Sequence, residues 1–486
     1  MISRDTERAA RQVFDLIVLG GGVHGIALTL EAARRGFSVL LCEQSDFGAK
    51  TSWNSSRIVH GGFRYLQHLD LVRFRESVVE RRWFLRHFPD LVSPLPCLLP
   101  LYEKGIRRRS VLRCALAIND LLSPDRSTGV KADRQIPGGK ILSRAETMET
   151  FPAVQRDRLK GAAVWHDATV PDSQVLLIEM LLWAIACGAW ALNYTEAKEL
   201  IETAGKVRGV VVWDRAENKA FEYRAPVVVN TTGPWCREIA SRFDRDVPGL
   251  YSFSLAVNVL IDRPPLSSSA LAVEPFAGSS STYFVVPWKE RILAGTLHLD
   301  SADVRRDDPV EDAAIRRLLA DVNRAVPGLD LGSSDVLRVL WGYVPAKSVG
   351  GVDQADRATI HNHGDGGGVK GLFSVNGVKF TTARAVGEET LRRIQEWRGL
   401  RLPSLTAVER PPRRRRATAG EFENLLVSNT SQAIDHAREL IDTQAVLRLD
   451  DLLLRRTDWG VLPARHAAIS SRLRELLRWR DRVEPN

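Results

Sequence analysis

The chain has 486 residues, which suggests roughly three domains, and its 44% hydrophobic and 26% charged residues are ordinary for a globular protein. The formal net charge is +9, and arginine far outnumbers lysine. An excess of positive charge suits an anionic substrate, an anionic lipid surface or nucleic acid. No DNA- or RNA-binding motif is visible, so we rank nucleic acid last and expect no nucleic-acid partner.

The cysteine pattern argues against a zinc site. Five cysteines make an odd number, and none are paired at the spacing of metal ligands, which favours a reducing compartment. They are Cys42, Cys97, Cys114, Cys187 and Cys236. The first residues, MISRDTERAARQ, lack the apolar stretch of a secretory signal, so we expect a cytoplasmic protein.

The first clear element is a strand that runs into a glycine-rich turn. Residues 15–19 form an apolar, β-rich run that is typical of a buried parallel strand. Gly20, Gly22 and Gly25 follow in the order GGGVHG. In a dinucleotide-binding turn, the first glycine permits the tight bend, the second lets the backbone approach a pyrophosphate, and the third lets helix and strand pack closely.

A helix and a second strand complete this βαβ unit. The pattern predicts a helix over residues 25–35, with N–H groups aimed at the phosphates, and a strand over residues 37–42 after Gly36. Glu43 stands at the end of that strand, where it can accept hydrogen bonds from ribose hydroxyls. A glutamate at this place disfavours a 2′-phosphate, but it does not separate NAD from FAD.

Three later segments suit chain that lies along a cofactor. Residues 51–66, TSWNSSRIVHGGFRYL, combine small hydroxyl side chains with paired glycines. Residues 227–235, VVVNTTGPW, read as a strand that ends in a Gly-Pro turn, as if closing over an adenosine half. Residues 372–382, LFSVNGVKFTT, read as a strand that enters a second glycine turn and a helix.

One apolar run, residues 175–192, could be mistaken for a membrane span. Glu179 lies inside it and Gly188 breaks it. A spanning helix needs about 20 apolar residues. We therefore expect a buried helix of about 13 residues followed by a strand.

The segments GGGVHG, TSWNSSRIVHGGFRYL, VVNTTGPW and FSVNGVKFTTAR together resemble the FAD-dependent glycerol-3-phosphate dehydrogenases, within the wider group of D-amino-acid-oxidase-like flavoproteins. The resemblance covers most of residues 14–400. It continues more faintly at 445–460, where VLRLDDLLLRRTDWG is similar to the start of the family's C-terminal helical domain. The cofactor that this resemblance implies is FAD.

The resemblance also implies which residues hold the FAD. The ADP half is expected on the first glycine turn and Glu43, near Ala197 and the Thr232–Gly233 turn, while residues 377–382 close over the isoalloxazine. The implied cofactor set is Gly20, Gly22, Gly25, Glu43, Thr51, Ser52, Ser55, Ser56, His60, Gly61, Ala197, Thr232, Gly233, Gly377, Val378, Lys379, Phe380 and Thr381. No residue stands out as a covalent attachment point.

The expected fold class is α/β, with a Rossmann-type FAD-binding domain, an antiparallel-sheet substrate domain and a C-terminal helical domain. The substrate domain is indicated by strands at 252–262, 281–288 and 291–299, with Trp288–Arg291 as the turn of a hairpin. The predicted bounds are 1–92, 155–245 and 336–400 for the FAD-binding domain, 93–154 and 246–335 for the substrate domain, and 417–486 for the helical domain.

A membrane surface is a second expected partner. Family members of this type sit on the cytoplasmic membrane face and pass electrons to quinone, so the resemblance implies quinone or O2 as electron acceptor. Residues 105–122, GIRRRSVLRCALAINDLL, place basic residues before an apolar helix face. The run Arg413–Arg416 reads either as a solvated linker or as a contact with anionic lipid.

The substrate is expected to be a small molecule, anionic in one reading, because forked or multiple donors grip phosphate and carboxylate. Arg64 and Tyr65 match the family's substrate-gripping pair, and Lys379 matches the lysine of its second glycine turn. We take Lys379 and His298 as the catalytic candidates. The pKa of a histidine lies near working pH, so its side chain can serve as a base.

Four positions depart from the family pattern. Val344 replaces the arginine of a Gly-Val-Arg-Pro run, and Asn258 stands where the family carries a histidine. The Gly-Thr-Thr-Asp run reads Gly-Thr-Leu-His and ends at His298, and Asn362 aligns with a further arginine. Removing an arginine that pairs with a buried anion is costly, so the sequence predicts an altered substrate specificity.

Three functions remain open from the sequence. The first is oxidation of a secondary alcohol, glycerol-3-phosphate-like or another polyol or hydroxy compound, by hydride transfer to the flavin N5. The second is amine or amino-acid oxidation, which the wider family performs on the same scaffold. The third is an FAD-bound partner protein without turnover, which the departures keep open.

Overall fold

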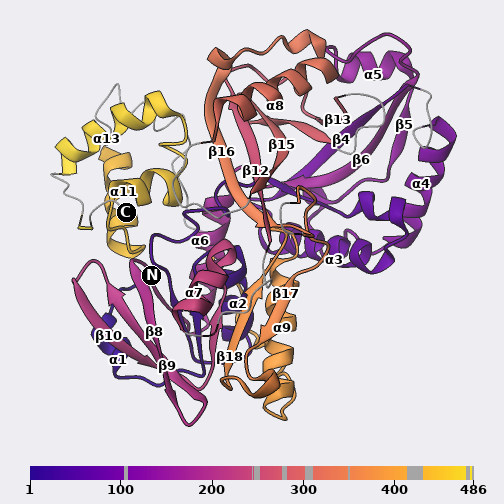
Figure 1. Ribbon diagram of the computed structural model, residues 1–486. Coiled ribbons are helices and arrows are strands. Elements are labelled where there is room, and N and C mark those ends of the chain that lie inside the picture. The colour runs from indigo at the N-terminus through magenta and orange to yellow at the C-terminus, as the bar shows by residue number, and fades with distance from the viewer. Residues whose placement is uncertain are drawn as a thin grey trace.

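A computed structural model gives the structure of the protein. It describes residues 1–102, 108–243, 245, 252–275, 282–301, 310–348, 351–412, 431–477 and 482–483. Two large sheets stand side by side, and a group of C-terminal helices lies next to them, beside the N-terminus (Figure 1). The run Arg413–Arg416 lies outside the described residues.

The first sheet has six strands in the order β17-β18-β11-β1-β2-β7. Their bounds are Leu16–Leu19 (β1), Val39–Cys42 (β2), Trp190–Leu192 (β7), Val228–Asn230 (β11), Thr359–Asn362 (β17) and Leu372–Asn376 (β18). All neighbours are parallel except β17, which runs antiparallel to β18. Every residue of β1, β2, β11 and β18 is buried, as expected for parallel strands covered on both faces.

Helices α2 (Val23–Ala33), α6 (Ser173–Ala186) and α9 (Ala383–Trp397) pack together against this sheet. Helix α2 contacts both of the others, which explains why it is apolar and buried almost all round. The βαβ unit predicted from the sequence is therefore present. The apolar run at 175–192 is a buried helix followed by β7, as expected, because α6 lies under α2 and not at a surface.

The second sheet has nine strands, with β16-β12-β15-β14-β13-β4-β6-β3 in order and β5 paired to β6. Their bounds are Ile58–Val59 (β3), Ser93–Leu101 (β4), Lys140–Leu142 (β5), Gly161–Thr169 (β6), Phe253–Ile261 (β12), Ala270–Val273 (β13), Tyr283–Trp288 (β14), Arg291–Ser301 (β15) and Val336–Pro345 (β16). Strands β14 and β15 form the predicted hairpin, and Lys289 takes a φ of 52° in its turn.

The strands of the two sheets alternate along the chain more often than the predicted domain bounds do. Strand β6 falls in the segment 155–245 and β16 in the segment 336–400, both assigned to the FAD-binding domain, yet both strands lie in the nine-stranded sheet. Each pairs there with strands of the substrate region, β6 with β4 and β16 with β12. A strand contributed by a distant segment leaves no local mark in the sequence.

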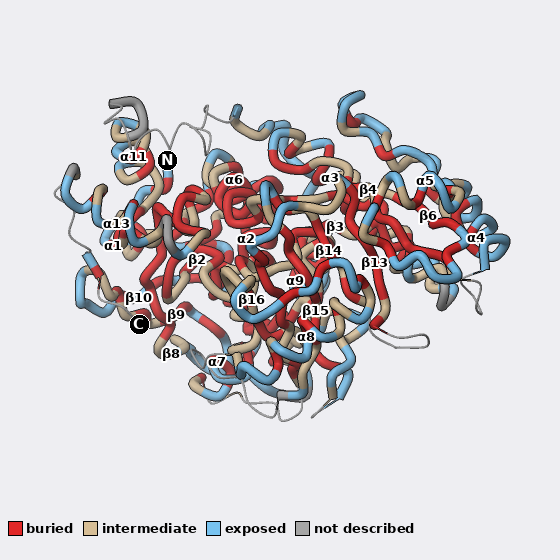
Figure 2. The backbone as a smooth tube through the Cα atoms, turned by 90° about the horizontal axis from the view of Figure 1, so that it is seen from above, coloured by how far each residue is buried: buried red, intermediate tan, exposed pale blue. Residues whose placement is uncertain are grey.

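The remaining elements cover the sheets or form a small one. A three-stranded sheet joins β8 (Thr195–Thr203), β9 (Lys206–Asp214) and β10 (Lys219–Arg224). The other helices are α1 (Thr6–Ala10), α3 (Leu71–His87), α4 (Arg109–Leu122), α5 (Arg144–Thr150), α7 (Cys236–Arg242) and α8 (Asp312–Ala325), with 3-10 turns η1 (Phe63–His68) and η4 (Gly233–Trp235). Figure 2 shows the buried backbone in the sheets and α2, while α4 has a largely exposed course.

The C-terminal region is helical, as predicted. It contains α11 (Ser431–Thr443), α12 (Leu449–Asp451), the π-helical turn η8 (Leu452–Arg456) and α13 (Pro463–Leu477), with a break at residues 457–462. Within the described parts of the chain, no helix has the length and apolar character needed to cross a bilayer.

Candidate active site

A cavity of about 1640 Å³ lies where the six-stranded and nine-stranded sheets meet. Its walls come from the ends of β1, β2 and β11, from the loop after β2, from β12, β15 and β16, and from the loop that follows β18. Typical small-molecule sites hold roughly 300–1,000 Å³. This cavity therefore has room for a dinucleotide together with a substrate.

The glycine turn after β1 forms one end of the cavity, and its glycines are required by close contacts. Gly20 has a φ of +103°, and a Cβ there would lie 2.9 Å from the Thr231 carbonyl oxygen. A Cβ at Gly25 would lie 1.9 Å from the Gly20 carbonyl oxygen. Only glycine lets the backbone bend this tightly and lets α2 start this close to the strand.

The first turn of α2 opens toward the cavity. Gly22 is the residue before the helix and offers no side-chain oxygen to cap it. Ser52, from the loop after β2, supplies one acceptor, since the Val23 N–H donates to its Oγ at 2.9 Å. The remaining N–H groups of the first turn are those that a helix start offers to phosphate.

Glu43 holds this turn as well as facing the cavity. Its Oε2 accepts a hydrogen bond from the Gly21 N–H at 2.6 Å, and its Oε1 accepts one from the Ser45 N–H at 2.8 Å. Burial raises the pKa of the carboxyl, and these two backbone bonds oppose that rise. The sequence predicts a ribose acceptor here; the structure adds that the same carboxylate ties the end of β2 to the phosphate turn.

Two orphaned polar atoms test whether the site fits a dinucleotide. His24 Nε2 and Trp235 Nε1 are buried, and neither has a hydrogen-bond partner among the described residues. Both residues line the cavity, and burial lowers the pKa of His24 to about 4, so its ring is neutral. A Cβ at Gly377 would lie 1.8 Å from His24 Nε2, so this glycine makes room for the ring.

His24 is thus part of the cavity wall. The glycine cradle, the open helix start, the carboxylate at the strand end and the unpartnered ring nitrogens together fit a dinucleotide such as FAD.

Most of the predicted cofactor residues line this one cavity. They are Gly20, Gly22, Glu43, Thr51, Ser52, Ser55, Ser56, His60, Ala197, Thr232, Gly233, Gly377, Val378, Lys379, Phe380 and Thr381. Two others, Gly25 and Gly61, lie behind its wall. A Cβ at Gly61 would be 1.9 Å from Arg81 Nη1, so this glycine serves packing, as Gly25 does.

His60 is held by a buried carboxylate that sequence reasoning missed. Asp167, on β6, accepts hydrogen bonds from His60 Nδ1 at 3.0 Å and from the Gly61 N–H at 2.7 Å. The ring of His60 lies 5.6 Å from that of Phe284 on β14. The His60 N–H donates to Thr381 Oγ1 at 3.1 Å, which joins the two sheets at the cavity.

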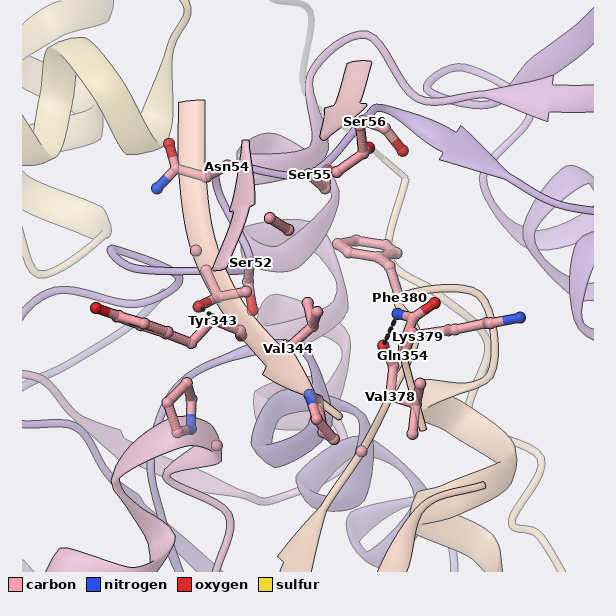
Figure 3. A pocket seen from close by; sticks show the side chains of 18 of the residues that line it. Ser52, Asn54, Ser55, Ser56, Tyr343, Val344, Gln354, Val378, Lys379 and Phe380 are labelled. Carbon is pink, nitrogen blue, oxygen red and sulfur yellow. Dashed lines mark hydrogen bonds between the residues drawn. The ribbon is translucent and has the colours of Figure 1, made fainter. Parts of the chain in front are cut away.

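The loop after β18 forms the opposite wall, as the resemblance implies. Val378, Lys379 and Phe380 follow one another along it, and Gln354 reaches across to it (Figure 3). The Gln354 amide donates to the Val378 carbonyl oxygen at 3.2 Å. Gln354 carries no signal in the sequence, because its loop meets this one only in the folded chain.

A cluster of positive charge gathers at this end of the cavity. The Lys379 Nζ lies 4.3 Å from the centre of the Tyr65 ring, and the Arg73 guanidinium lies 4.7 Å from it. Burial, and then the charge of Arg64, lower the pKa of Lys379 to about 8. Arg64, Tyr65 and Lys379 all line the cavity, so the three predicted substrate-binding residues are together.

His298 lies on β15 within the same region. Its Nδ1 is 3.4 Å from Ser254 Oγ, which leaves Nε2 free of that contact. Burial lowers the pKa of His298, and the charge of Arg64 lowers it further, while Asp353 opposes the shift. The imidazole is therefore unprotonated at neutral pH. Asp353 lines the cavity, and sequence reasoning missed it.

The positions that depart from the family pattern differ in where they lie. Val344 and Asn258 line the cavity (Val344 is seen in Figure 3). Asn258 Oδ1 accepts a hydrogen bond from Thr296 Oγ1 at 2.7 Å, so its side chain is engaged within the sheet. Asn362 does not line the cavity; its amide donates to Asp365 at the edge of the six-stranded sheet. The alignment of Asn362 with a substrate arginine therefore has no counterpart in this cavity.

Comparison with known proteins agrees with this geometry. The DAO family, described as FAD dependent oxidoreductase, matches residues 15–393. A glycerol-3-phosphate dehydrogenase of Synechocystis sp. (strain ATCC 27184 / PCC 6803 / Kazusa) is 31% identical over 405 residues, which cover 78% of this chain and 70% of that protein. The mitochondrial glycerol-3-phosphate dehydrogenase of Homo sapiens is 30% identical over 393 residues, 78% of this chain and 52% of that protein. The chain thus spans about half the length of its mitochondrial relatives.

Two solved structures share the fold. The glycerol-3-phosphate dehydrogenase from Bacillus halodurans, complexed with FAD, has a TM-score of 0.69 at 22% identity and covers 98% of this chain and 94% of its own. The L-α-glycerophosphate oxidase from Mycoplasma pneumoniae, with FAD bound, has a TM-score of 0.60 at 15% identity and covers 84% and 100%. The chain belongs to the FAD dependent oxidoreductase family, among the relatives of the glycerol-3-phosphate dehydrogenases, and it is an oxidoreductase with FAD as cofactor.

Proposed function

We propose that the protein oxidises a secondary alcohol that carries an anionic group, a glycerol-3-phosphate-like polyol ester or a hydroxy acid. The observation that carries the proposal is the position of Arg64 and Lys379 on one wall of the cavity, close enough for one charge to depress the pKa of the other. Two cations that repel each other gain most from an anion placed between them. The names of the Synechocystis and human relatives point the same way.

The residues divide the work in this proposal. Bound FAD supplies a two-electron acceptor for the hydride of the substrate carbon. Gly20, Gly22 and the start of α2 would hold its phosphates, and residues 377–381 line the other wall of the cavity. Arg64 and Lys379 orient the anionic end of the substrate, so that the carbinol carbon is presented in a fixed position.

His298 is the proposed base. Its lowered pKa keeps the imidazole neutral at neutral pH, so one ring nitrogen has a lone pair that can take the proton of the substrate hydroxyl. The proximity of Asp353 favours the protonated ring that results. Lys379 is the second catalytic candidate, because with a pKa of about 8 it can hold or lose a proton near working pH.

The departures at Val344 and Asn258 support an altered specificity. A valine cannot donate to an anion, and the oxygen of the Asn258 amide is engaged with Thr296. Val344 and Asn258 therefore do not supply the phosphate contacts that the family resemblance implies, and Arg64 and Lys379 are left to bind the anion. We propose that the substrate presents a smaller anionic group than a phosphate ester, or presents it from a different direction.

Amine or amino-acid oxidation is the second candidate, and one observation favours it. The carboxylate of Asp353 shares the cavity with His298, Arg64 and Lys379. A zwitterion could place its carboxylate on the cations and its ammonium near Asp353. An FAD-bound protein without turnover is the third.

Anaerobic reduction of the flavin tests the proposal. FAD-loaded protein is mixed with polyol phosphates, hydroxy acids and amino acids, and loss of the visible flavin absorbance is followed. Bleaching by an anionic alcohol and not by its uncharged analogue supports the proposal. Bleaching by amino acids alone supports the second candidate, and bleaching by no compound while FAD stays bound supports the third.

The electron acceptor and a membrane contact complete the proposal. Helix α4 carries an exposed stripe of Val111, Ile118 and Leu121 next to the exposed Arg109 and Arg113, which suits an anionic bilayer surface. We propose that the protein is cytoplasmic and binds the inner membrane face peripherally, with quinone or O2 as acceptor.

Co-sedimentation with vesicles tests this contact. Binding to anionic vesicles that weakens with salt supports it, and equal recovery in the supernatant with anionic and neutral vesicles contradicts it. Hydrogen peroxide formation in air, compared with reduction of a quinone analogue, separates the two acceptors.

A further inference from the structure

The loop after β2 has two faces that meet different partners. We call residues 46–56 the cofactor loop. One face lines the cavity through Thr51, Ser52, Ser55 and Ser56. Asp46 and Trp53 do not line the cavity; they face the C-terminal region, in particular residues 444–461, which the proposed function does not use.

Arg456 fastens the start of the cofactor loop. Its Nη1 and Nη2 donate to the two carboxylate oxygens of Asp46 at 2.6 and 2.8 Å, and both residues are buried. Asn193 donates to Asp46 at 2.8 Å and also to the Ala445 carbonyl oxygen at 2.9 Å. A forked ion pair in this setting fixes direction as well as distance, so it sets where the loop begins.

Arg455 fastens the middle of the cofactor loop. Its Nη2 donates to the Ala49 carbonyl oxygen at 3.4 Å, and its guanidinium lies 5.0 Å from the centre of the Trp53 ring. Arg338, from β16, lies 5.3 Å from the same ring and donates to the Val461 carbonyl oxygen at 2.8 Å. The Trp53 indole is thus held between one arginine of the C-terminal region and one of the nine-stranded sheet.

Other residues of the segment 444–461 contact elements of both large sheets. Tyr194, which follows β7, donates to Asp451 at 2.7 Å. Lys289, in the hairpin between β14 and β15, is paired with Asp458. The segment 444–461 therefore contacts elements of both large sheets as well as the cofactor loop.

We propose that residues 444–461 act as a latch on the cofactor loop and that they control the release of FAD. Arg455 and Arg456 are positioning residues in this role, because neither lines the cavity. Their effect reaches the phosphate turn through Ser52, whose Oγ accepts the Val23 N–H at the start of α2. The inference does not depend on which substrate is oxidised.

The test is the rate of FAD release from full-length holoprotein. Free-flavin fluorescence is followed after dilution, at a temperature well below unfolding, for the parent protein, Arg455→Gln, Arg455→Lys and Arg472→Gln. We expect Arg455→Gln to release FAD about tenfold faster, because it loses a charged donor to Ala49 and a cation at Trp53. Arg455→Lys keeps the charge and should recover part of the slow release.

Arg472→Gln is the matched control, because its partner Glu475 lies on the outer face of α13. Its release rate should stay at the parent value. Should Arg455→Gln fail to fold, Trp53→Leu removes the ring that Arg455 faces and leaves the ion pairs intact. This variant should also release FAD faster, and it changes no residue that lines the cavity. Unchanged release in the Arg455 and Trp53 variants, or equal acceleration in Arg472→Gln, would overturn the latch.

Discussion

The two ends of the cavity are built from different material. At the end formed by β1, β2 and α2, the cavity is shaped by backbone and glycines, such as Gly20 and Gly22, and Ser52 caps the first helical N–H, that of Val23. At the other end they come from side chains that converge from separate elements, such as Arg64, His298 and Lys379. The first end fits a dinucleotide by its chain path alone, whereas the second end depends on which side chain each position carries.

This difference explains why one end keeps its motif while the other departs from it. A Cβ at Gly25 would meet the Gly20 carbonyl, so exchange there disturbs both the turn and the helix. A side chain such as Val344 can change with its strand intact, because β16 pairs through its backbone. Specificity can therefore be altered at the substrate end without loss of the cofactor.

The largest effect should follow from a methyl group at the cofactor end. Gly25→Ala places a Cβ 1.9 Å from the Gly20 carbonyl oxygen, and overpacking of this kind costs about 1–3 kcal/mol or more. We expect the protein to lose at least about 100-fold in FAD affinity, measured by titration of the apoprotein with FAD. Gly332→Ala, whose Cβ would have its nearest neighbour at 3.7 Å, should bind FAD normally.

An effect of similar size, on the rate and not on FAD affinity, should come from the proposed base at the substrate end. His298→Asn removes the neutral imidazole, and loss of a general base costs about 100- to 10,000-fold in rate. FAD binding should remain at the parent level, because the residue lies at the other end of the cavity. A rate of anaerobic flavin reduction within about threefold of the parent would contradict the role of His298.

Loss of the cations should weaken the substrate more than the cofactor. Arg64→Met or Lys379→Met should raise the KM for an anionic substrate by about 10- to 100-fold, as expected for a charge-assisted contact of about 1.5–3 kcal/mol. Lys379→Arg should retain part of the affinity. An unchanged KM in both methionine variants, with unchanged preference for anions, would show that the anion lies elsewhere.

Titration of Lys379 gives this prediction a pH dependence. With a pKa of about 8, the ammonium carries its charge below pH 8 and loses it as pH rises through that value. Affinity for an anion should therefore fall above pH 8 in the parent protein and change less in Lys379→Met. Because a bound anion stabilises the ammonium, binding should also be accompanied by proton uptake, measurable by calorimetry in buffers of different ionisation enthalpy.

The smallest expected effect is a gain. Val344→Arg restores the arginine of the family pattern at a position that lines the cavity. We expect a several-fold lower KM for a phosphate ester relative to a hydroxy acid, because the guanidinium can donate two hydrogen bonds to phosphate oxygens. The gain should be small, because Arg64 and Lys379 repel the new cation until an anion is present. A matched Val344→Met variant controls for bulk. Equal changes for both variants would assign the effect to size and not to charge.

Most of the residues that the sequence assigns to the cofactor line the cavity, and so do Arg64, Tyr65, His298 and Lys379, while their roles stay predictions. Gly20, Gly22 and Glu43 lie in one short βαβ unit, so their spacing alone indicates their arrangement. Asp167, Asp353 and Gln354 come from strands and loops that meet only in the folded sheet, and no local pattern marks them. The places of β6 and β16 in the nine-stranded sheet carry no local signal for the same reason, because strand pairing between distant segments has no periodicity of its own.

The most direct test of the account is a binding titration of the FAD-loaded protein without oxygen. Glycerol 3-phosphate and a hydroxy acid are each compared with an uncharged analogue, and the shift of the visible flavin spectrum is followed. The account predicts that an anionic ligand saturates the shift at a concentration at least about 10- to 100-fold below its uncharged analogue, and that Arg64→Met removes this difference. Equal concentrations for charged and uncharged ligands in the parent protein would contradict it.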